Sequence, residues 1–110
     1  MNNVNLIGRL VKDVDLTYTP NGTAVAKFVL AVKRKFPNPT SGEYESDFIK
    51  CIAIKKKAEA LANYTEKGLR VGITGNLQTR NYEDENKKMH YVTEVFVEDT
   101  TLIERKSRPQ

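Results

Sequence analysis

Cationic side chains stand beside aromatic ones at several places in this chain. The segment 33–36 has the sequence KRKF, 48–50 has FIK and 80–82 has RNY, and three lysines follow one another at 55–57. Lysine and arginine neutralise phosphates, and an aromatic ring can stack on any nucleobase, which is worth about 1–3 kcal/mol per base. This interleaving predicts a surface that binds a single-stranded nucleic acid.

The aromatic residues differ in the environment that the sequence predicts for them. Phe36 and Tyr82 fall in polar segments with no apolar neighbours to bury them, so we expect them to be exposed and to bind. Phe28 and Phe96 fall in continuous strand patterns and are predicted core residues, whereas the pattern leaves Phe48 open. Four tyrosines are expected at the edge of the core, each with a solvated hydroxyl group: Tyr18, Tyr44, Tyr64 and Tyr91.

The chain offers little for catalysis or metal binding. Its one cysteine, Cys51, excludes an internal disulfide and a thiolate-rich zinc site, and its place in a strand predicts a small buried hydrophobe. Its one histidine, His90, has no evident aspartate or cysteine partner in the sequence. The acidic run 83–85 predicts solvated charge, because catalytic carboxylates converge from different elements. We therefore expect no enzyme, no cofactor and no metal ion.

Strands must position most of these residues. Glycines at 72 and 75 predict a bulge or tight bend within the fourth strand. The second strand is apolar on both faces except at Lys27, which suits a barrel or a subunit interface. The predicted strands are five, the first with a short continuation at 16–19: 4–11, 24–32, 44–55, 69–79 and 89–98.

The segments between the strands predict their connections. Residues 19–23 form a tight turn, while 33–43 and 81–88 are long polar loops. From 56 to 68 the apolar spacing becomes helical, with Gly68 as the expected C-cap. Three strands, a helix and two strands predict an all-β chain, a five-stranded OB-fold barrel with its helix between strands 3 and 4; such barrels bind oligonucleotides or oligosaccharides.

Length and charge fit one domain with a polyanionic partner. The 110 residues carry 18 lysines and arginines against 14 aspartates and glutamates, a net charge of +4, which alone is weak evidence for nucleic acid. We expect an OB-fold domain over 1–103 and a flexible basic end over 104–110. Since no apolar run approaches the roughly 20 residues that span a bilayer, we expect a cytoplasmic protein without membrane contact.

Several short stretches, in their order and spacing, form a recognisable pattern: 5–10 (NLIGRL), 19–28 (TPNGTAVAKF), Ala58-Glu59, Tyr64, Lys67-Gly68, Val71, Gly75, Leu77, Thr79-Arg80 and 93–95 (TEV). On these residues the chain resembles the bacterial single-stranded DNA-binding proteins, the SSB family, over about residues 3 to 103. The resemblance implies an OB fold and a nucleoid-associated homotetramer. It further implies wrapping and protection of single-stranded DNA, without sequence preference or catalysis, in replication, recombination, repair or DNA uptake.

The resemblance also assigns residues to roles. Family stacking positions fall on Phe36, Phe48, Ile54 and Tyr82, and family cationic positions on Lys50, Lys56, Lys67 and Arg80. The sequence pattern adds four further cations: Lys33, Arg34, Lys35 and Lys55. The family commonly has tryptophan at the first two stacking positions and phenylalanine at the third. Because Ile54 can pack on a base but cannot stack, we expect weaker binding per nucleotide than in such relatives.

Two points stay open at the level of sequence. Family members usually continue into an acidic tail that recruits repair and replication enzymes, and this chain instead stops at a basic end, so recruitment through a tail is not expected. The chain is then either a shortened form or a naturally short paralogue of the kind associated with DNA uptake. The alternative function is that of an OB-fold accessory subunit, of primosomal type, which acts mainly through protein–protein assembly.

Overall fold

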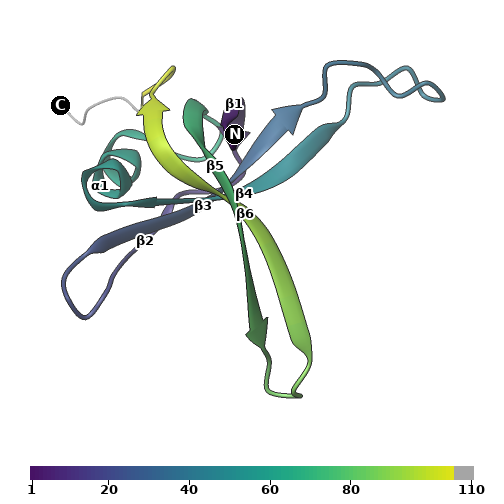
Figure 1. The fold of residues 1–110 in the computed structure, drawn as a ribbon. Helices are drawn as coiled ribbons and strands as arrows, with labels where there is room; N and C mark the ends of the chain where they lie inside the picture. The colour runs from purple at the N-terminus through teal and green to yellow at the C-terminus, as the bar shows by residue number, and fades with distance from the viewer. Residues whose placement is uncertain (106–110) are drawn as a thin grey trace.

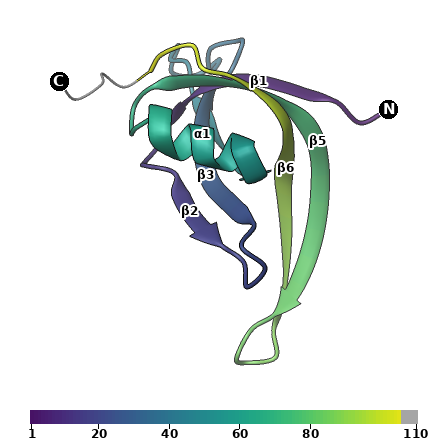
Figure 2. The same cartoon turned by 90° about the vertical axis from the view of Figure 1, so that its left-hand side faces the viewer.

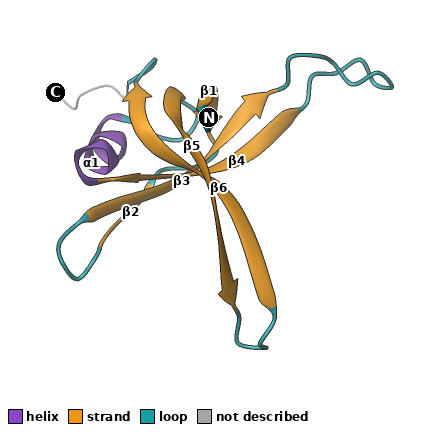
Figure 3. Ribbon diagram, in the orientation of Figure 1, coloured by secondary structure: helices purple, strands orange, loops and turns teal. Residues whose placement is uncertain are grey.

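The computed structural model describes residues 1–105, which form six strands and one helix (Figures 1 and 3). The first predicted strand is divided into β1 and β2, and the predicted order of strands and helix is confirmed. Residues 106–110, part of the end predicted to be flexible, lie outside the described residues. The elements are β1 (Val4–Leu10), β2 (Asp15–Tyr18), β3 (Ala24–Lys33), β4 (Ser46–Ile54), α1 (Lys55–Tyr64), β5 (Arg70–Glu83) and β6 (Met89–Thr101).

The strand pairings form a ring. The sheet order is β1-β5-β6-β4-β3-β2, and β1 also pairs with β3, so that five strands have a partner on both sides. The pairing of β4 with β6 is parallel and short, at Cys51–Val95 and Ile52–Phe96, whereas the other pairings are antiparallel. This ring of five strands corresponds to the predicted OB-fold topology.

Side chains that point into the ring form the core. Phe28 and Leu30 of β3 are buried, as are Val95 and Val97 of β6, and the prediction for Phe28 is confirmed. Phe96 lies between the two valines and therefore points to the other side of β6, where it is half-buried. The prediction of Phe96 as a core residue was wrong, because strand alternation and not local apolar content decides which side chain is enclosed.

Helix α1 packs against β2, β3 and β4 and buries Ala58 and Leu61 (Figure 2). It ends at Tyr64, three residues earlier than the predicted boundary before Gly68. Thr65 adopts an extended conformation, and both its N–H and its hydroxyl group donate to the carbonyl oxygen of Leu61. This side-chain bond ends the helix, and Gly68, with φ of 91°, serves the turn into β5 instead of capping the helix.

The bulge predicted in the fourth strand lies at Gly75. The register between β5 and β6 shifts between Thr74 and Gly75, and a Cβ atom at Gly75 would collide with the carbonyl oxygen of Phe96. Only glycine permits this close approach of the two backbones. The bulge therefore fixes how the long β5–β6 hairpin leaves the ring.

Two hairpins project from the ring (Figure 1). We call residues 31–48 the β3–β4 arm and residues 78–94 the β5–β6 arm. The radius of gyration is 15.6 Å, against about 13 Å for a compact domain of this size, as projecting arms require. In the β5–β6 arm the strands continue to Glu83 and Met89, so the prediction of a loop from 81 to 88 was wrong at its start. Cross-strand pairing extends the hairpin through these polar residues although they bury little apolar surface.

Candidate nucleic-acid interface

The outward face of β4 carries three of the predicted site residues in a row. Ile49, Cys51 and Ala53 point toward the core, so that the alternating Phe48, Lys50 and Ile54 point away from it. Phe48 is 67% exposed, Lys50 is exposed and Ile54 is half-buried. The sequence pattern alone does not assign Phe48 to core or surface, and its place on the strand makes it an accessible aromatic face beside a cation.

Next to this row, β3 contributes the neighbouring surface. Val29 is the register partner of Lys50, and Lys27 is the partner of Ile52. Lys27 is exposed, and it was not among the predicted cations. The outward face of the β3–β4 pair therefore alternates cationic and apolar side chains. A surface that binds single-stranded nucleic acid requires both, for the phosphates and for the bases.

The loop of the β3–β4 arm presents Phe36, which is 79% exposed, in agreement with the prediction of an accessible ring. The loop has internal order, because the Asn38 side chain accepts hydrogen bonds from Thr40 and Ser41 and donates to Glu45 at 2.6 Å. Lys33 lies over the ring of Tyr44, with its Nζ 4.7 Å from the ring centroid.

Arg34, a predicted phosphate contact, is held by two carboxylates. Its Nε and Nη2 donate to Asp47 at 3.0 and 2.8 Å, and its Nη1 lies 3.5 Å from Glu45. The hydrogen bond from Arg34 lowers the pKa of Asp47, and the same contact raises the pKa of Arg34. A phosphate would have to displace these carboxylates. In this structure Arg34 therefore stabilises the arm and is not free to contact a ligand. The neighbouring Lys35 is exposed.

The β5–β6 arm places Tyr82 and Arg80 on one face. Tyr82 is 46% exposed and stacks on His90, its cross-strand partner, with the ring centroids 4.9 Å apart. Arg80 donates to Glu94 at 3.1 Å through Nε, and its guanidinium carbon lies 5.8 Å from the Tyr82 ring centroid. Unlike Arg34, Arg80 has one carboxylate partner in the described part of the chain and keeps its Nη groups for other contacts.

A hollow of about 190 Å³ lies between the base of the β5–β6 arm and the outward face of the β3–β4 pair. Lys50 of β4 and Arg80 of β5 both line it, although they are far apart in sequence, together with Lys27. Lys12 adds a fourth cation, and the acids of this hollow are Asp15 and Glu94. With four cations and two acids, the hollow has a formal net charge of +2 and suits a phosphate.

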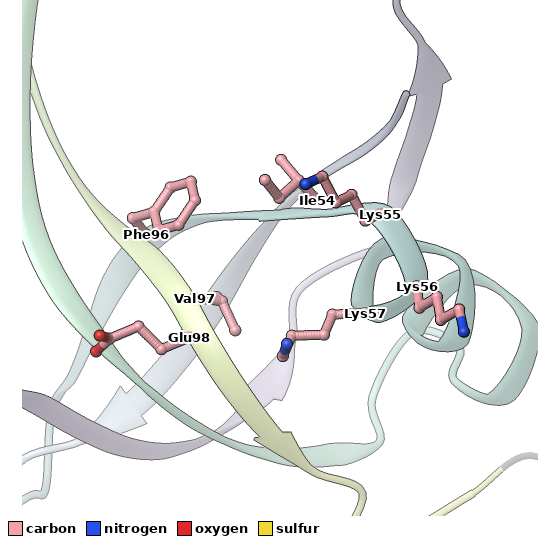
Figure 4. A pocket seen from close by; sticks show the side chains of 7 residues that line it. All are labelled: Ile54, Lys55, Lys56, Lys57, Phe96, Val97 and Glu98. Atoms are coloured by element: carbon pink, nitrogen blue, oxygen red, sulfur yellow. The ribbon is translucent and has the colours of Figure 1, made fainter. Parts of the chain in front are cut away.

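A second basic hollow, of about 580 Å³, lies where β4 enters α1 (Figure 4). Lys55 and Lys57 extend from the start of the helix toward β6, whereas Lys56 extends to the opposite side (Figure 4). Ile54 and Phe96 supply the apolar part of its lining. The first turn of α1 has no acidic residue, so its lysines oppose the helix dipole, and a bound anion would relieve that repulsion.

Lys67, a cation assigned by the family resemblance, lies apart from the others. It sits in the turn after α1, where its backbone N–H donates to Asp13 at 2.8 Å. It lines neither of the two basic hollows. The structure therefore brings Lys50 and Arg80 together and places Lys55 beside Ile54, but it does not join Lys67 to either group.

Several candidate contacts are not among the site residues assigned from the sequence. Lys57 and Lys27 belong to the basic hollows, and Tyr91, expected at the edge of the core, is 80% exposed. Tyr91, Leu77 and Phe48 line a third hollow, of about 330 Å³, between the arms. Alternation along a strand predicts enclosure only within the ring, and Tyr91 lies beyond it on the arm.

The environments of Cys51 and His90 do not favour a catalytic role. Cys51 is buried, and loss of solvation raises the pKa of its thiol to about 12, so it is a core residue and not a nucleophile. His90, for which the sequence indicated no partner, lies 2.7 Å from Asp84. Within residues 1–105 no cluster of histidine, cysteine and acidic side chains could hold a metal ion. No helix in the same range is long and apolar enough to cross a membrane.

Known proteins with similar sequences share one family. Residues 1–103 match the model of the single-strand binding protein family. The chain is 56% identical over 104 residues to the "Single-stranded DNA-binding protein" of Bacillus cereus, covering 94% of this chain and 61% of that protein. It is 51% identical over 110 residues to "Single-stranded DNA-binding protein 3" of Streptococcus agalactiae, covering 100% of this chain and 79% of that protein. The chain thus spans about three fifths of the Bacillus relative.

Proposed function

Because this chain belongs to the single-strand binding protein family, we propose that it binds, wraps and protects single-stranded DNA without sequence preference and without catalysis. The observation that carries the proposal is the outward row of Phe48, Lys50 and Ile54 on β4, which continues through the basic hollow to Arg80. Aromatic rings stack on bases and the neighbouring cations neutralise phosphates, and neither contact depends on base identity. The cellular setting that follows is the nucleoid in the cytoplasm, during replication, recombination, repair or DNA uptake.

The proposed contacts fall into two groups by chemistry. The bases stack or pack on Phe36, Phe48, Ile54 and Tyr82. The phosphates are neutralised by cations along the same path, of which Lys50, Arg80 and the lysines at the start of α1 are the best placed. Arg34 and Lys67 are the weakest of the predicted set, because one is held by two carboxylates and the other lies apart.

Assembly into a homotetramer belongs to the same proposal. Ile7 of β1 is 61% exposed, and with Ile73 and Ile103 it lines a separate apolar hollow away from the proposed DNA contacts. Exposed apolar surface of this kind is characteristic of an interaction site. Four copies would place four binding surfaces on one particle, around which a single strand can wrap.

Direct titration tests the proposal. A dye-labelled oligo-dT of about 40 nucleotides exceeds the roughly 4–16 nucleotides that one OB domain covers, and its anisotropy should rise on adding protein at low salt. The logarithm of the binding constant should fall against the logarithm of salt concentration, with a slope of about −0.7 per phosphate contact. An oligo-dA of equal length should bind with a similar salt slope. No binding at low salt would reject the proposal and favour an OB-fold assembly subunit.

A further inference from the structure

The β5–β6 arm contains a supported tyrosine. The rings of Tyr82 and His90 are close to parallel, with an angle of 15° between their planes and 4.9 Å between their centroids. The two residues are direct cross-strand partners, so the hairpin register itself sets this stack. The guanidinium carbon of Arg80 also lies 5.8 Å from the Tyr82 ring centroid, and Tyr82 remains 46% exposed, which leaves part of its surface open to a ligand.

Asp84 holds the histidine in this stack. Its Oδ2 lies 2.7 Å from His90 Nε2, while its Oδ1 accepts hydrogen bonds of 2.9 Å from the backbone N–H groups of Asn86 and Lys88. Its backbone carbonyl also accepts a bond from Lys87 at the tip of the turn. One carboxylate therefore shapes the turn and fixes the imidazole.

We propose that His90 is a positioning residue for single-strand binding: its imidazole, fixed by Asp84, packs on one face of Tyr82 and leaves the opposite face to a nucleobase. The inference rests on the proposed function, since it assigns a role within the same site. A base that binds there extends an existing stack of His90 and Tyr82. Because the tyrosine ring is already ordered, binding loses less side-chain freedom than it would at an unsupported ring.

The stack sets the expected size of the effect. Immobilising a free side chain on binding weakens affinity by about 2- to 12-fold. His90→Ala should therefore weaken oligo-dT binding within this range, while Tyr82→Ala should weaken it more, because it removes the stacking face itself. In the Tyr82→Ala background, His90→Ala should have little further effect, because the histidine then has no ring to position.

Rescue separates positioning from a merely structural role. His90→Phe restores an aromatic ring beneath Tyr82 but cannot bond to Asp84, so it should recover most of the affinity lost in His90→Ala. Asn81→Ala, which changes the adjacent residue on the opposite face of β5, is the matched control and should bind like the unsubstituted protein. The readouts are the anisotropy titration with labelled oligo-dT and the circular dichroism melt of each variant.

The outcomes divide clearly. Loss in His90→Ala, recovery in His90→Phe and non-additivity with Tyr82→Ala support the inference. If the unsubstituted protein binds oligo-dT and His90→Ala binds equally well, the inference is overturned and the proposed function stands. Equal, unrescued losses in His90→Ala and His90→Phe also overturn it, because the stack is then not what matters. If the unsubstituted protein does not bind, both the function and the inference are rejected.

Discussion

Each arm carries an arginine and an exposed aromatic residue, but the two arms differ in which of these side chains is held by its neighbours. In the β3–β4 arm the arginine is restrained, since Asp47 and Glu45 hold Arg34, while Phe36 on the loop is 79% exposed. In the β5–β6 arm the aromatic ring is restrained, since His90 stacks on Tyr82, while Arg80 keeps its Nη groups free of carboxylates among the described residues. Similar composition can therefore supply either a supported stacking face or an internally neutralised charge.

The difference has an energetic consequence. A side chain that is already ordered loses less freedom on binding, whereas ordering a free one costs about 0.5–1.5 kcal/mol. An arginine already paired with two acids contributes less to a phosphate contact than its formal charge indicates. We therefore expect the β5–β6 arm to contribute more binding energy per aromatic residue than the loop of the β3–β4 arm.

The largest effect tests whether the arms bind by stacking at all. The triple substitution Phe36→Ala, Phe48→Ala and Tyr82→Ala should weaken oligo-dT binding by about 100-fold or more, because stacking is worth about 1–3 kcal/mol per base. Titration at one low salt concentration measures the loss, and a thermal melt provides the control for folding. Unchanged affinity in a folded triple variant would remove the basis for comparing the arms.

The next effect ranks the aromatic residues of the two arms. Tyr82→Ala should weaken binding by about 10- to 30-fold and Phe36→Ala by about 5-fold, since the loop phenylalanine must first be ordered. The same anisotropy titration measures both, with Tyr18→Ala as an exposed aromatic control on β2, away from both arms. A larger loss at Phe36 than at Tyr82 would reverse the comparison.

A smaller effect concerns the two arginines. Arg80→Gln should make the salt dependence of binding less steep by about 0.7, the contribution of one phosphate contact, whereas Arg34→Gln should leave the slope unchanged. Arg34→Gln should instead lower the melting temperature slightly, because it breaks exposed ion pairs with Asp47 and Glu45. Binding constants at several salt concentrations measure the two slopes. Equal changes of slope in Arg80→Gln and Arg34→Gln would contradict the proposed difference between the two arginines.

The smallest effect is the response of each arm to acid. Bonding to Arg34 lowers the pKa of Asp47, and bonding to His90 lowers the pKa of Asp84. A carboxyl group with a lowered pKa in the folded state stabilises the fold above its ordinary value and loses that contribution as the pH falls through its folded-state pKa. Melting temperatures should therefore fall below about pH 4, and less steeply in Asp47→Asn and Asp84→Asn. An unaltered pH dependence in both variants would show that neither pair stabilises its arm.

Much of the fold follows from local patterns in the sequence. Alternation predicted the order of the strands, while turn residues predicted the turn at 19–23 and glycine predicted the bulge at Gly75, because these features depend on neighbouring residues and on the absence of a side chain. The helix end was misplaced, since Thr65 ends α1 through a bond to Leu61 that spacing does not reveal. Phe96 was misplaced because its environment depends on the side of β6 that faces the ring.

For the candidate site, too, the sequence determines some features and the tertiary structure determines others. The sequence by itself determined the chemistry: cations beside aromatic rings, with a single cysteine and a single histidine. Only the tertiary structure decided which of those residues can act together, joining Lys50 to Arg80, pairing Arg34 with Asp47 and stacking Tyr82 on His90. The physical reason is that a side chain's type is local, whereas its exposure and its partners depend on strand register and on how the arms leave the ring.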